Sequence, residues 1–341
     1  MHDVPNMAKI SILGAGSWGI ALAVMLNSSR HKIFLWEFNS QEMFKLRDQR
    51  EHTEKLPGIV IPQDVKITDD LKEATRNSEM ILLALPSHTV REVAKKMVSV
   101  DLNDPIIVNL AKGIENDTLC RMSEILIQEL PESLHKKITT LSGPSHAEEV
   151  SKKIPTTVVV AGFDQNILKK VQEVFMNPYF RVYTNSDLIG VELGGSLKNI
   201  IAIASGICDG LNLGDNTKGA LLTRGLAEMI RLGEKLGAKA QTFAGLSGIG
   251  DLITTCFSRY SRNRYVGEEI GKGKKLDEIL ANMVMVAEGV KTTISAYQLS
   301  QKYNVEMPIT FEVYQVLFKG KEPLKGVYDL MTRDPKSEIW S

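Results

Sequence analysis

The chain has 341 residues, about twice the usual length of one domain, so we expect two domains. Lys and Arg total 41, and so do Asp and Glu, so the chain carries no net charge. This balance excludes the broad basic surface with which proteins bind nucleic acid or anionic membranes. With 43% hydrophobic and 24% charged residues, the composition is that of a folded globular protein and excludes disordered and collagenous classes.

The cysteines and the start of the chain point to a reducing compartment. Cys120, Cys208 and Cys256 are far apart and odd in number, which argues against a disulfide framework or a zinc site. No secretory signal is evident, because Asp3 lies among the first ten residues and Gly14 interrupts the apolar stretch that follows. We therefore expect a cytoplasmic protein without a bound metal.

Up to about residue 185, short β-branched runs alternate with amphipathic helical stretches. Helical periods such as Trp18–Ser28 and His88–Val98 lie between most of the runs. This order is typical of βαβ units, so the sequence predicts a Rossmann-type α/β domain with a mainly parallel sheet. The expected strands are Lys9–Leu13, Lys32–Glu37, Glu79–Leu85, Pro105–Leu110, Lys137–Leu141, Thr156–Gly162 and Phe180–Thr184.

From residue 186 onward, strand patterns disappear and long helical patterns follow. We expect a dinucleotide-binding domain over residues 1–188 and an all-helical, substrate-binding domain over residues 189–341. The expected helices are Leu188–Cys208, Lys218–Leu236, Arg262–Gly271, Val290–Tyr303 and Pro308–Lys319.

The first of these helices is long and apolar enough to resemble a membrane span. However, Glu192, Lys198 and Asn199 lie in its middle, and a charge there costs several kcal/mol in lipid. We therefore interpret it as a buried helix of a soluble protein, with no membrane span.

A G-x-G-x-x-G motif occupies Gly14, Gly16 and Gly19. By itself it is also compatible with an ordinary tight turn. Here it follows the strand Lys9–Leu13 and opens a helix, as a dinucleotide fold requires. Gly14 would form the turn, Gly16 would let the pyrophosphate approach, and Gly19 would allow helix packing, with the helix N-terminus facing the phosphates.

Glu37 lies at the end of the second expected strand. A carboxylate there accepts hydrogen bonds from the adenosine 2'-hydroxyl and repels a 2'-phosphate, which favours NAD(H) over NADP(H). An ordinary solvated glutamate at a strand end is the open alternative.

Three further strands end in loops that should surround the cofactor, because ligands lie outside the carboxyl ends of strands in open α/β sheets. Lys112 leaves an apolar strand just before a glycine and is a candidate substrate contact, although a surface lysine is the alternative. His88 and His146 are candidate acid/base groups, but helix capping is the more ordinary role at such positions. The loops are 84–88, 109–113 and 142–147.

Lys198 lies on a helix that is otherwise almost wholly apolar. Burial disfavours its charged form and lowers its pKa toward the range useful for general acid/base catalysis. The alternatives are a lysine that reaches solvent or one paired with a carboxylate. Small residues on its helix face would leave room for a ligand: Gly194, Gly195, Ala202 and Ser205.

Asp251 follows two glycines, and a Ser-Arg-Asn sequence comes shortly after it. If Ser261 is near a helix N-cap, the free amides, Arg262 and Asn263 would form a pocket for an anion such as phosphate. A solvated basic turn is the alternative.

Together these motifs resemble the bacterial NAD(P)-dependent glycerol-3-phosphate dehydrogenases, in order and over nearly the whole chain. The resemblance implies reversible reduction of dihydroxyacetone phosphate to sn-glycerol 3-phosphate, which supplies glycerophospholipid synthesis. It also implies NAD(H) and NADP(H) as cofactors, a cytoplasmic location and a homodimer. The motifs are 14–23, 109–115, 142–147, 192–199, 245–251 and 261–263.

The resemblance also implies roles for individual residues. Lys198 is similar to the family's proton donor and acceptor, Lys112 to a second lysine shared by substrate and cofactor, and Asp251 completes the catalytic set. The further implied substrate contacts are Gly143, Ser145, Ser261, Arg262 and Asn263. The implied cofactor contacts are Ser17, Trp18, Lys112, Ala147, Arg262, Val286 and Glu288, beside the glycines of the motif.

One position departs from the family pattern. Many relatives carry a basic residue or His just past the second strand, where this chain has Glu37-Phe38-Asn39. Two other functions stay open: a related dehydrogenase that oxidises β-hydroxyacids or sugar acids, and a nucleotide sensor without catalysis. A phosphate pocket is not expected in all of the related dehydrogenases, and a sensor needs no proton donor.

Overall fold

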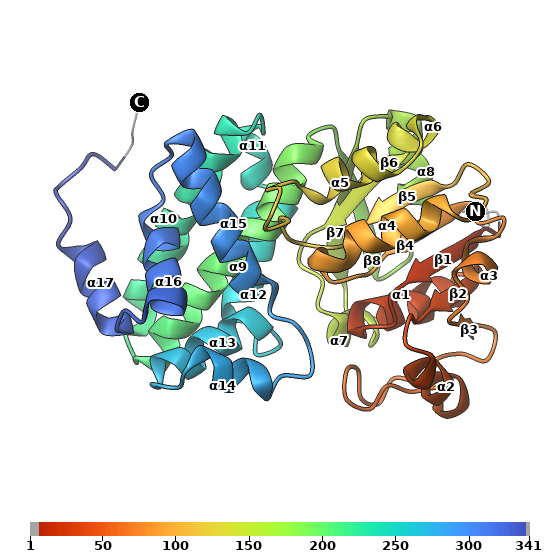
Figure 1. The fold of residues 1–341 in the computed structure, drawn as a ribbon, viewed down its shortest axis with the longest axis horizontal. Coiled ribbons are helices and arrows are strands. Elements are labelled where there is room, and N and C mark those ends of the chain that lie inside the picture. The colour runs from red at the N-terminus through yellow and green to blue at the C-terminus, as the bar shows by residue number, and fades with distance from the viewer. Residues whose placement is uncertain (1–6, 339–341) are drawn as a thin grey trace.

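The computed structural model describes residues 7–338. Two domains lie side by side: an eight-stranded sheet with helices on both faces and a domain made of helices (Figure 1). Both expected architectures are therefore confirmed. The sheet ends at Asn185 and the first helix of the second domain begins at Leu188.

The strand order in the sheet is β3-β2-β1-β4-β5-β6-β7-β8. Every neighbouring pair is parallel except β6 and β7, which are antiparallel. Strands β2 and β3 lie on one side of β1, and β4 to β8 lie on the other, so the strand order reverses between β1 and β4. In open α/β sheets a ligand-binding crevice forms at such a point. The strands are β1 (Lys9–Leu13), β2 (Lys32–Trp36), β3 (Lys66–Thr68), β4 (Met80–Leu83), β5 (Ile106–Asn109), β6 (Ile138–Ser142), β7 (Thr156–Gly162) and β8 (Phe180–Asn185).

The seven expected strands are present, with ends that differ by at most two residues. The sequence analysis missed β3, an edge strand of three residues that pairs only with β2 among the described strands. Three residues are too few to show the alternation by which a strand is recognised in sequence.

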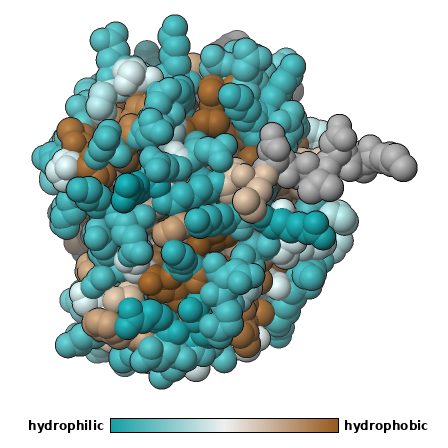
Figure 2. Space-filling model, turned by 90° about the vertical axis from the view of Figure 1, so that its right-hand side faces the viewer, coloured by the Kyte–Doolittle hydropathy of each residue, from teal (hydrophilic) through white to brown (hydrophobic). Residues whose placement is uncertain are grey.

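The described helices of the sheet domain have at most twelve residues. They are α1 (Ser17–Ser28), α2 (Ser40–Gln49), α3 (Leu71–Thr75), η1 (Ser87–Thr89), α4 (Val90–Val98), α5 (Met122–Glu129), α6 (Glu132–His135), α7 (Ala147–Val150) and α8 (Gln165–Phe175). The sheet buries apolar residues on both faces beneath these helices. Figure 2 shows the result: this end of the molecule is largely hydrophilic, with hydrophobic residues in small separate groups.

The second domain is built around one helix, α9, which packs against α10, α12, α13 and α15. Its elements are α9 (Leu188–Gly210), α10 (Gly214–Lys235), α11 (Ala240–Phe243), η2 (Leu246–Gly250), α12 (Asp251–Phe257), α13 (Arg262–Gly271), α14 (Leu276–Ala281), α15 (Glu288–Tyr303), α16 (Pro308–Lys319) and α17 (Pro323–Met331). By length and composition α9 could cross a membrane, but 94% of its most apolar window is buried inside the protein. It is the core helix of this domain.

Two glycines let α13 approach α9 closely. A Cβ at Gly206 would lie 1.9 Å from the carbonyl oxygen of Arg264, and one at Gly267 would lie 1.9 Å from that of Ile203. Any larger residue at either position would push the helices apart. This contact places the first turns of α13 along the C-terminal half of α9.

Candidate functional site

The glycine-rich turn lies between β1 and α1, at the crevice of the sheet. Gly14 has φ +110°, and a Cβ there would lie 2.4 Å from the carbonyl oxygen of Ala84. A Cβ at Gly19 would lie 1.9 Å from the carbonyl oxygen of Gly14. The tight turn and the close packing expected of the first and third glycines are therefore present.

Gly16 differs from both, because a Cβ there would meet no atom within 4 Å. It is the N-cap of α1 and makes no side-chain cap hydrogen bond, and the first turn, which holds Ser17 and Trp18, has no acidic residue. A helix start with available amide groups, positive dipole and open space suits a pyrophosphate. The residues present thus fit the phosphates of a dinucleotide.

Glu37 follows β2 at the same edge of the sheet. Its side chain is buried, with the residue only 6% exposed, and its carboxylate accepts a hydrogen bond of 3.1 Å from the Asn39 N–H. A fully solvated glutamate, the alternative interpretation, is therefore wrong. Its contact with a ribose stays a prediction.

Two lysines from different domains meet at one carboxylate. Lys112 follows β5 and donates to Oδ2 of Asp251 over 2.7 Å, and Lys198 on α9 donates to Oδ1 over 2.6 Å. Asp251 opens α12. Lys112 also donates to the Gly143 carbonyl oxygen over 3.1 Å, so it is no free surface lysine. The three expected catalytic residues form one cluster where the domains meet.

The charges of this cluster are tuned by burial and by each other. Burial lowers the pKa of Lys198 to about 8, although Asp251 opposes the shift. Burial alone would raise the pKa of Asp251, but Lys112 and Lys198 outweigh it and hold the pKa below its usual value. Lys198 is therefore both buried, as expected, and paired with a carboxylate, as the alternative held.

Thr255 completes the surroundings of Lys198, and sequence reasoning missed it. Lys198 Nζ lies 2.6 Å from Thr255 Oγ1, which in turn donates to the Asp251 main-chain carbonyl oxygen over 2.6 Å. Thr255 lies four residues after Asp251 on α12, on the same helix face. The four-residue spacing from Asp251 could therefore have identified Thr255 from the sequence.

The small residues beside Lys198 do not leave the space for a ligand that we expected. A Cβ at Gly194 would lie 2.6 Å from the Ser247 carbonyl oxygen, and one at Gly195 would lie 2.7 Å from Ser142 Oγ. These glycines instead allow other parts of the chain to pack against α9. Helix periodicity shows which residues share a face but not what covers that face.

The loop after β6 approaches the lysines. Ser145 is half-buried and its hydroxyl donates to the Gly143 carbonyl oxygen over 2.9 Å. Ala147 is buried and begins α7, which packs against α1. Burial, and then the charge of Lys198, lower the pKa of His146 to about 4, so this imidazole is neutral beside the lysine cluster. Gly143 thus contacts the lysine cluster through Lys112, while the contacts of Gly143, Ser145 and Ala147 with substrate or cofactor stay predictions.

The Ser-Arg-Asn segment begins α13. Ser261 is the N-cap, as expected, and its Oγ accepts a hydrogen bond of 3.2 Å from the Arg264 N–H. Arg262 is exposed and donates to the Val286 carbonyl oxygen over 2.8 Å. A helix N-terminus and a guanidinium group at one place suit a phosphate.

Asn263 is placed differently from its neighbours. Its Nδ2 donates to Asn199 Oδ1 over 2.9 Å, and its Oδ1 accepts from the Gly289 N–H over 2.8 Å. Asn263 therefore links α9, α13 and α15, and these hydrogen bonds stabilise the pocket's framework. The amide's contact with a phosphate remains a prediction.

Val286 and Glu288 lie at the start of α15. Both oxygens of the Glu288 carboxylate accept from Ser87: Oε1 from the N–H over 2.8 Å and Oε2 from the hydroxyl over 2.5 Å. Ser87 begins η1 after β4, so this contact joins the two domains. His88 is the next residue, and burial lowers its pKa.

Within residues 7–338, no group of three or more His, Cys, Asp or Glu side chains is arranged to hold a metal ion. The three cysteines are free. The charged groups that meet at the centre of the site are Lys112, Lys198 and Asp251, which come from three separate segments.

Comparisons with known proteins agree with this arrangement. Residues 9–168 match the family model of the NAD-dependent glycerol-3-phosphate dehydrogenase N-terminus, and residues 187–328 match that of the C-terminus. A glycerol-3-phosphate dehydrogenase [NAD(P)+] of Thermoanaerobacter sp. is 54% identical over 97% of this chain and 99% of its own length. A glycerol-3-phosphate dehydrogenase [NAD(P)+] of Fusobacterium nucleatum is 50% identical over 98% of this chain and 100% of its own length.

A solved structure shows the same fold. The crystal structure of glycerol-3-phosphate dehydrogenase from Coxiella burnetii has a TM-score of 0.91 and 37% identity, covering 96% of this chain and 100% of its own. Both family models, together matching nearly the whole chain, coincide with the two observed domains. The chain belongs to the NAD-dependent glycerol-3-phosphate dehydrogenase family.

Proposed function

We propose that this protein catalyses the reversible reduction of dihydroxyacetone phosphate to sn-glycerol 3-phosphate with NAD(P)H, and so supplies glycerophospholipid synthesis. The observation that carries the proposal is the Lys198–Asp251–Lys112 cluster, in a chain that also has a turn suited to a dinucleotide and a helix start suited to a phosphate. Membership of the family supports the same reaction.

The chain's own residues account for the proton and the charges. The bound nicotinamide would supply the hydride. In reduction Lys198 Nζ donates a proton to the ketone oxygen, and in oxidation it accepts the proton of the hydroxyl. A pKa of about 8 leaves both forms of Lys198 accessible near neutral pH, as a group working in both directions requires. Lys112 stabilises the negative charge that develops on the oxygen.

The remaining residues bind and orient the two ligands. Gly14, Gly16 and Gly19 with the start of α1 hold the dinucleotide, and Glu37 would bind its ribose. Arg262 and the N-terminus of α13 hold the substrate phosphate. Because the phosphate is remote from the reacting carbon, its binding energy orients the carbonyl and discriminates against unphosphorylated ketones.

Initial rates of NADH and NADPH oxidation with dihydroxyacetone phosphate test this proposal. The panel also contains β-hydroxyacids, sugar acids and dihydroxyacetone without phosphate. We expect turnover with the phosphorylated ketone only. Turnover with a hydroxyacid would instead favour the related dehydrogenases, and NADH binding without any turnover would favour a sensor.

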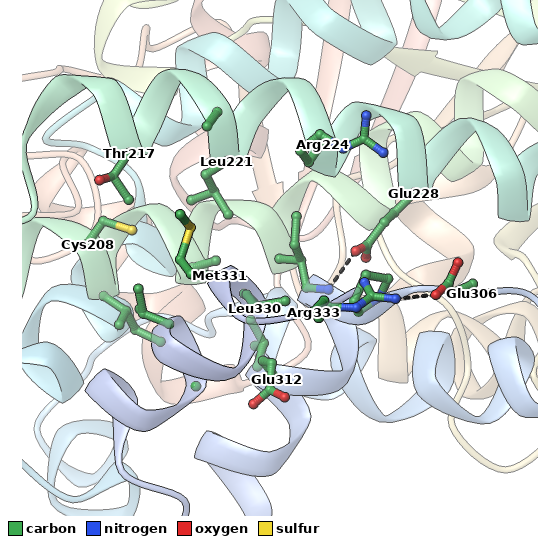
Figure 3. Close-up of a pocket in the computed structure, with 18 of the residues that line it drawn as sticks. Cys208, Thr217, Leu221, Arg224, Glu228, Glu306, Glu312, Leu330, Met331 and Arg333 are labelled. Atoms are coloured by element: carbon green, nitrogen blue, oxygen red, sulfur yellow. Dashed lines mark hydrogen bonds and ion pairs between the residues drawn. The ribbon is translucent and has the colours of Figure 1, made fainter. Parts of the chain in front are cut away.

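We also propose a homodimer in the cytoplasm. The supporting observation is α17, on which Leu324, Tyr328 and Met331 recur at helical spacing and are 52%, 66% and 79% exposed. A cavity of about 1040 Å³ lies beneath the same helix, with Leu330 and Leu221 in its wall (Figure 3). Such apolar surface is typical of contacts between subunits.

Sedimentation equilibrium tests the dimer. The parent protein should sediment with the mass of two chains, and Tyr328→Glu should give one chain with unchanged helix content. A parent protein of single-chain mass would contradict the dimer. Recovery of the enzyme in the soluble fraction of lysed cells tests the location.

A further inference from the structure

Glu192 is a buried carboxylate that the proposed reaction does not use. It lies on α9, and the residue is 5% exposed. Lys198 follows six residues later on the same helix, which corresponds to a rise of about 9 Å. The orientation of Glu192 and the position of the Lys198 amine are therefore determined by the same rigid element.

Among the residues that the structure describes, four hydrogen-bond donors reach the Glu192 carboxylate, and all four belong to the other domain. Arg121 donates over 2.7 Å to Oε2 and the Ser123 hydroxyl over 2.6 Å to the same oxygen. The Ser123 N–H donates over 2.8 Å and the Thr140 hydroxyl over 3.3 Å to Oε1. Arg121 and Ser123 lie at the N-terminus of α5, so a carboxylate of the helical domain caps a helix of the sheet domain.

We expect this contact to fix the position of α9 more than it adds to the free energy of unfolding. Burial raises the pKa of Glu192, while Arg121 and the hydrogen bonds from Ser123 oppose that shift. The cost of removing two charges from water largely cancels their attraction, so a buried ion pair is weak as a source of net stability. Four donors converging on two oxygens nevertheless define one position for the helix.

The same turn of α9 is fixed to the loop that carries Lys112. The Ser196 hydroxyl lies 3.2 Å from the carbonyl oxygen of Gly113, the residue after Lys112. It also donates to the Glu192 main-chain carbonyl oxygen over 2.8 Å. The turn from Glu192 to Ser196 thus sets the height and rotation of α9 against the sheet domain, directly before Lys198.

We propose that Glu192 is a positioning residue for proton transfer. By capping α5 across the domain boundary, it holds α9 so that Lys198 and Lys112, which come from different domains, reach the same substrate oxygen together. The inference rests on the proposed reductase function. It predicts that the loss of this cap slows the chemical step while both ligands still bind.

Glu192→Gln tests the proposal. The amide keeps the size of the side chain, but its NH₂ group replaces an accepting oxygen and faces the N–H and O–H groups that donate to Glu192. We expect turnover of dihydroxyacetone phosphate to fall about tenfold to a hundredfold, because small displacements of catalytic groups have effects of that size. The Michaelis constants should change less than about threefold. With NADH deuterated at C4, the isotope effect on turnover should rise, since chemistry becomes slower relative to product release.

Glu228→Gln is the matched control. Glu228 is also a buried carboxylate of the helical domain (Figure 3). It accepts from the Ile309 N–H over 2.5 Å and from the Thr310 N–H over 3.1 Å. It thus caps α16, a helix of its own domain. We expect this variant to change thermal stability while its turnover and isotope effect stay those of the parent.

Ser123→Ala is the second variant and keeps the test decisive if Glu192→Gln does not fold. Removing one donor should lower turnover by a smaller factor, about threefold to tenfold, with the same rise in isotope effect. Adding Ser123→Ala to Glu192→Gln should cause little further loss, because both changes remove the same contact.

The outcomes separate this inference from the proposed function. Folded Glu192→Gln or Ser123→Ala with parental turnover and isotope effect would overturn the positioning role. Equal losses of turnover in Glu192→Gln and Glu228→Gln would overturn it too, since they would show a merely structural effect. A parent protein that does not reduce dihydroxyacetone phosphate would refute the proposed function instead.

Discussion

The two domains contribute to the site in different ways. The sheet domain offers mainly backbone: a turn of glycines, the amide groups that open α1 and the carbonyl oxygen of Gly143. The helical domain offers charged side chains: Lys198 and Asp251 are buried at the centre, and Arg262 is exposed at the start of α13. Lys112 is the charged group that the sheet domain adds to this centre.

This division separates binding from chemistry. Backbone groups bind an anion without a titrating charge, so they suit a cofactor that is held in the same way in both reaction directions. A lysine with a lowered pKa suits the proton that moves. Apart from changes at Lys112, changes in the sheet domain should therefore act mainly on cofactor affinity, and changes in the helical domain on turnover and substrate binding.

The largest expected effect is that of Lys198→Ala. Turnover should fall by about 10²-fold to 10⁴-fold, the usual contribution of a general acid/base, with NADH affinity nearly unchanged. Stopped-flow fluorescence measures NADH binding and steady-state rates measure turnover. Turnover within threefold of the parent would disprove the assignment and with it the division between the domains.

The pH dependence of turnover provides the second test. Oxidation of glycerol 3-phosphate needs the neutral amine of Lys198, so turnover should fall about tenfold per pH unit below the pKa of about 8. Reduction needs the ammonium form and should fall above that pKa. Saturating substrate separates this effect from phosphate ionisation, and the reversed pair of profiles would contradict the proton role.

Cofactor preference tests Glu37, the acidic contact assigned to the sheet domain's dinucleotide site. A carboxylate about 5 Å from a 2'-phosphate costs roughly 3 kcal/mol at an effective dielectric near 20, and salt reduces this. We expect NADH to be preferred over NADPH about tenfold to a hundredfold in kcat/KM. Glu37→Ser should remove most of the preference without changing the KM for dihydroxyacetone phosphate, whereas equal constants in the parent would show that Glu37 does not meet the ribose.

Arg262→Ala should weaken the binding of dihydroxyacetone phosphate by about 2 kcal/mol or more, about thirtyfold, because it removes a charge-assisted contact to phosphate. Arg262→Lys serves as control and should recover part of the affinity. Cofactor binding should also weaken if this arginine contacts both ligands. An unchanged KM for the substrate would refute the phosphate pocket.

The smallest expected effect on ligand binding is that of Gly16 in the glycine motif, and Gly14 of the same motif provides a contrast. Gly16→Ala should leave the unfolding temperature unchanged, because its Cβ meets open space, and should weaken NADH binding about tenfold by crowding the pyrophosphate. Gly14→Ala should lower the unfolding temperature, since φ is +110° and the Cβ contacts Ala84. Calorimetry and NADH titration of both variants distinguish these roles, and unchanged NADH affinity in folded Gly16→Ala would contradict the proposed approach.

Much of the fold follows from local sequence. Apolar runs of strand length, helical periods and the glycine motif have short-range spacing, and each appeared in the structure near its expected bounds. The N-cap at Ser261 was predictable for the same reason, because its partner Arg264 is three residues away. The three-residue strand β3 was missed because it is too short to show a period.

The sequence by itself determined which residue types were present and which local elements carried them. Only tertiary structure decided their partners: Lys198 and Asp251 are 53 positions apart, and Lys112 and Asp251 are 139 apart. It also turned Gly195 and Asn263 toward protein neighbours where a ligand was expected. The physical reason is that periodicity defines the faces of an element, whereas the packing of α9 against both domains determines which atoms each face meets.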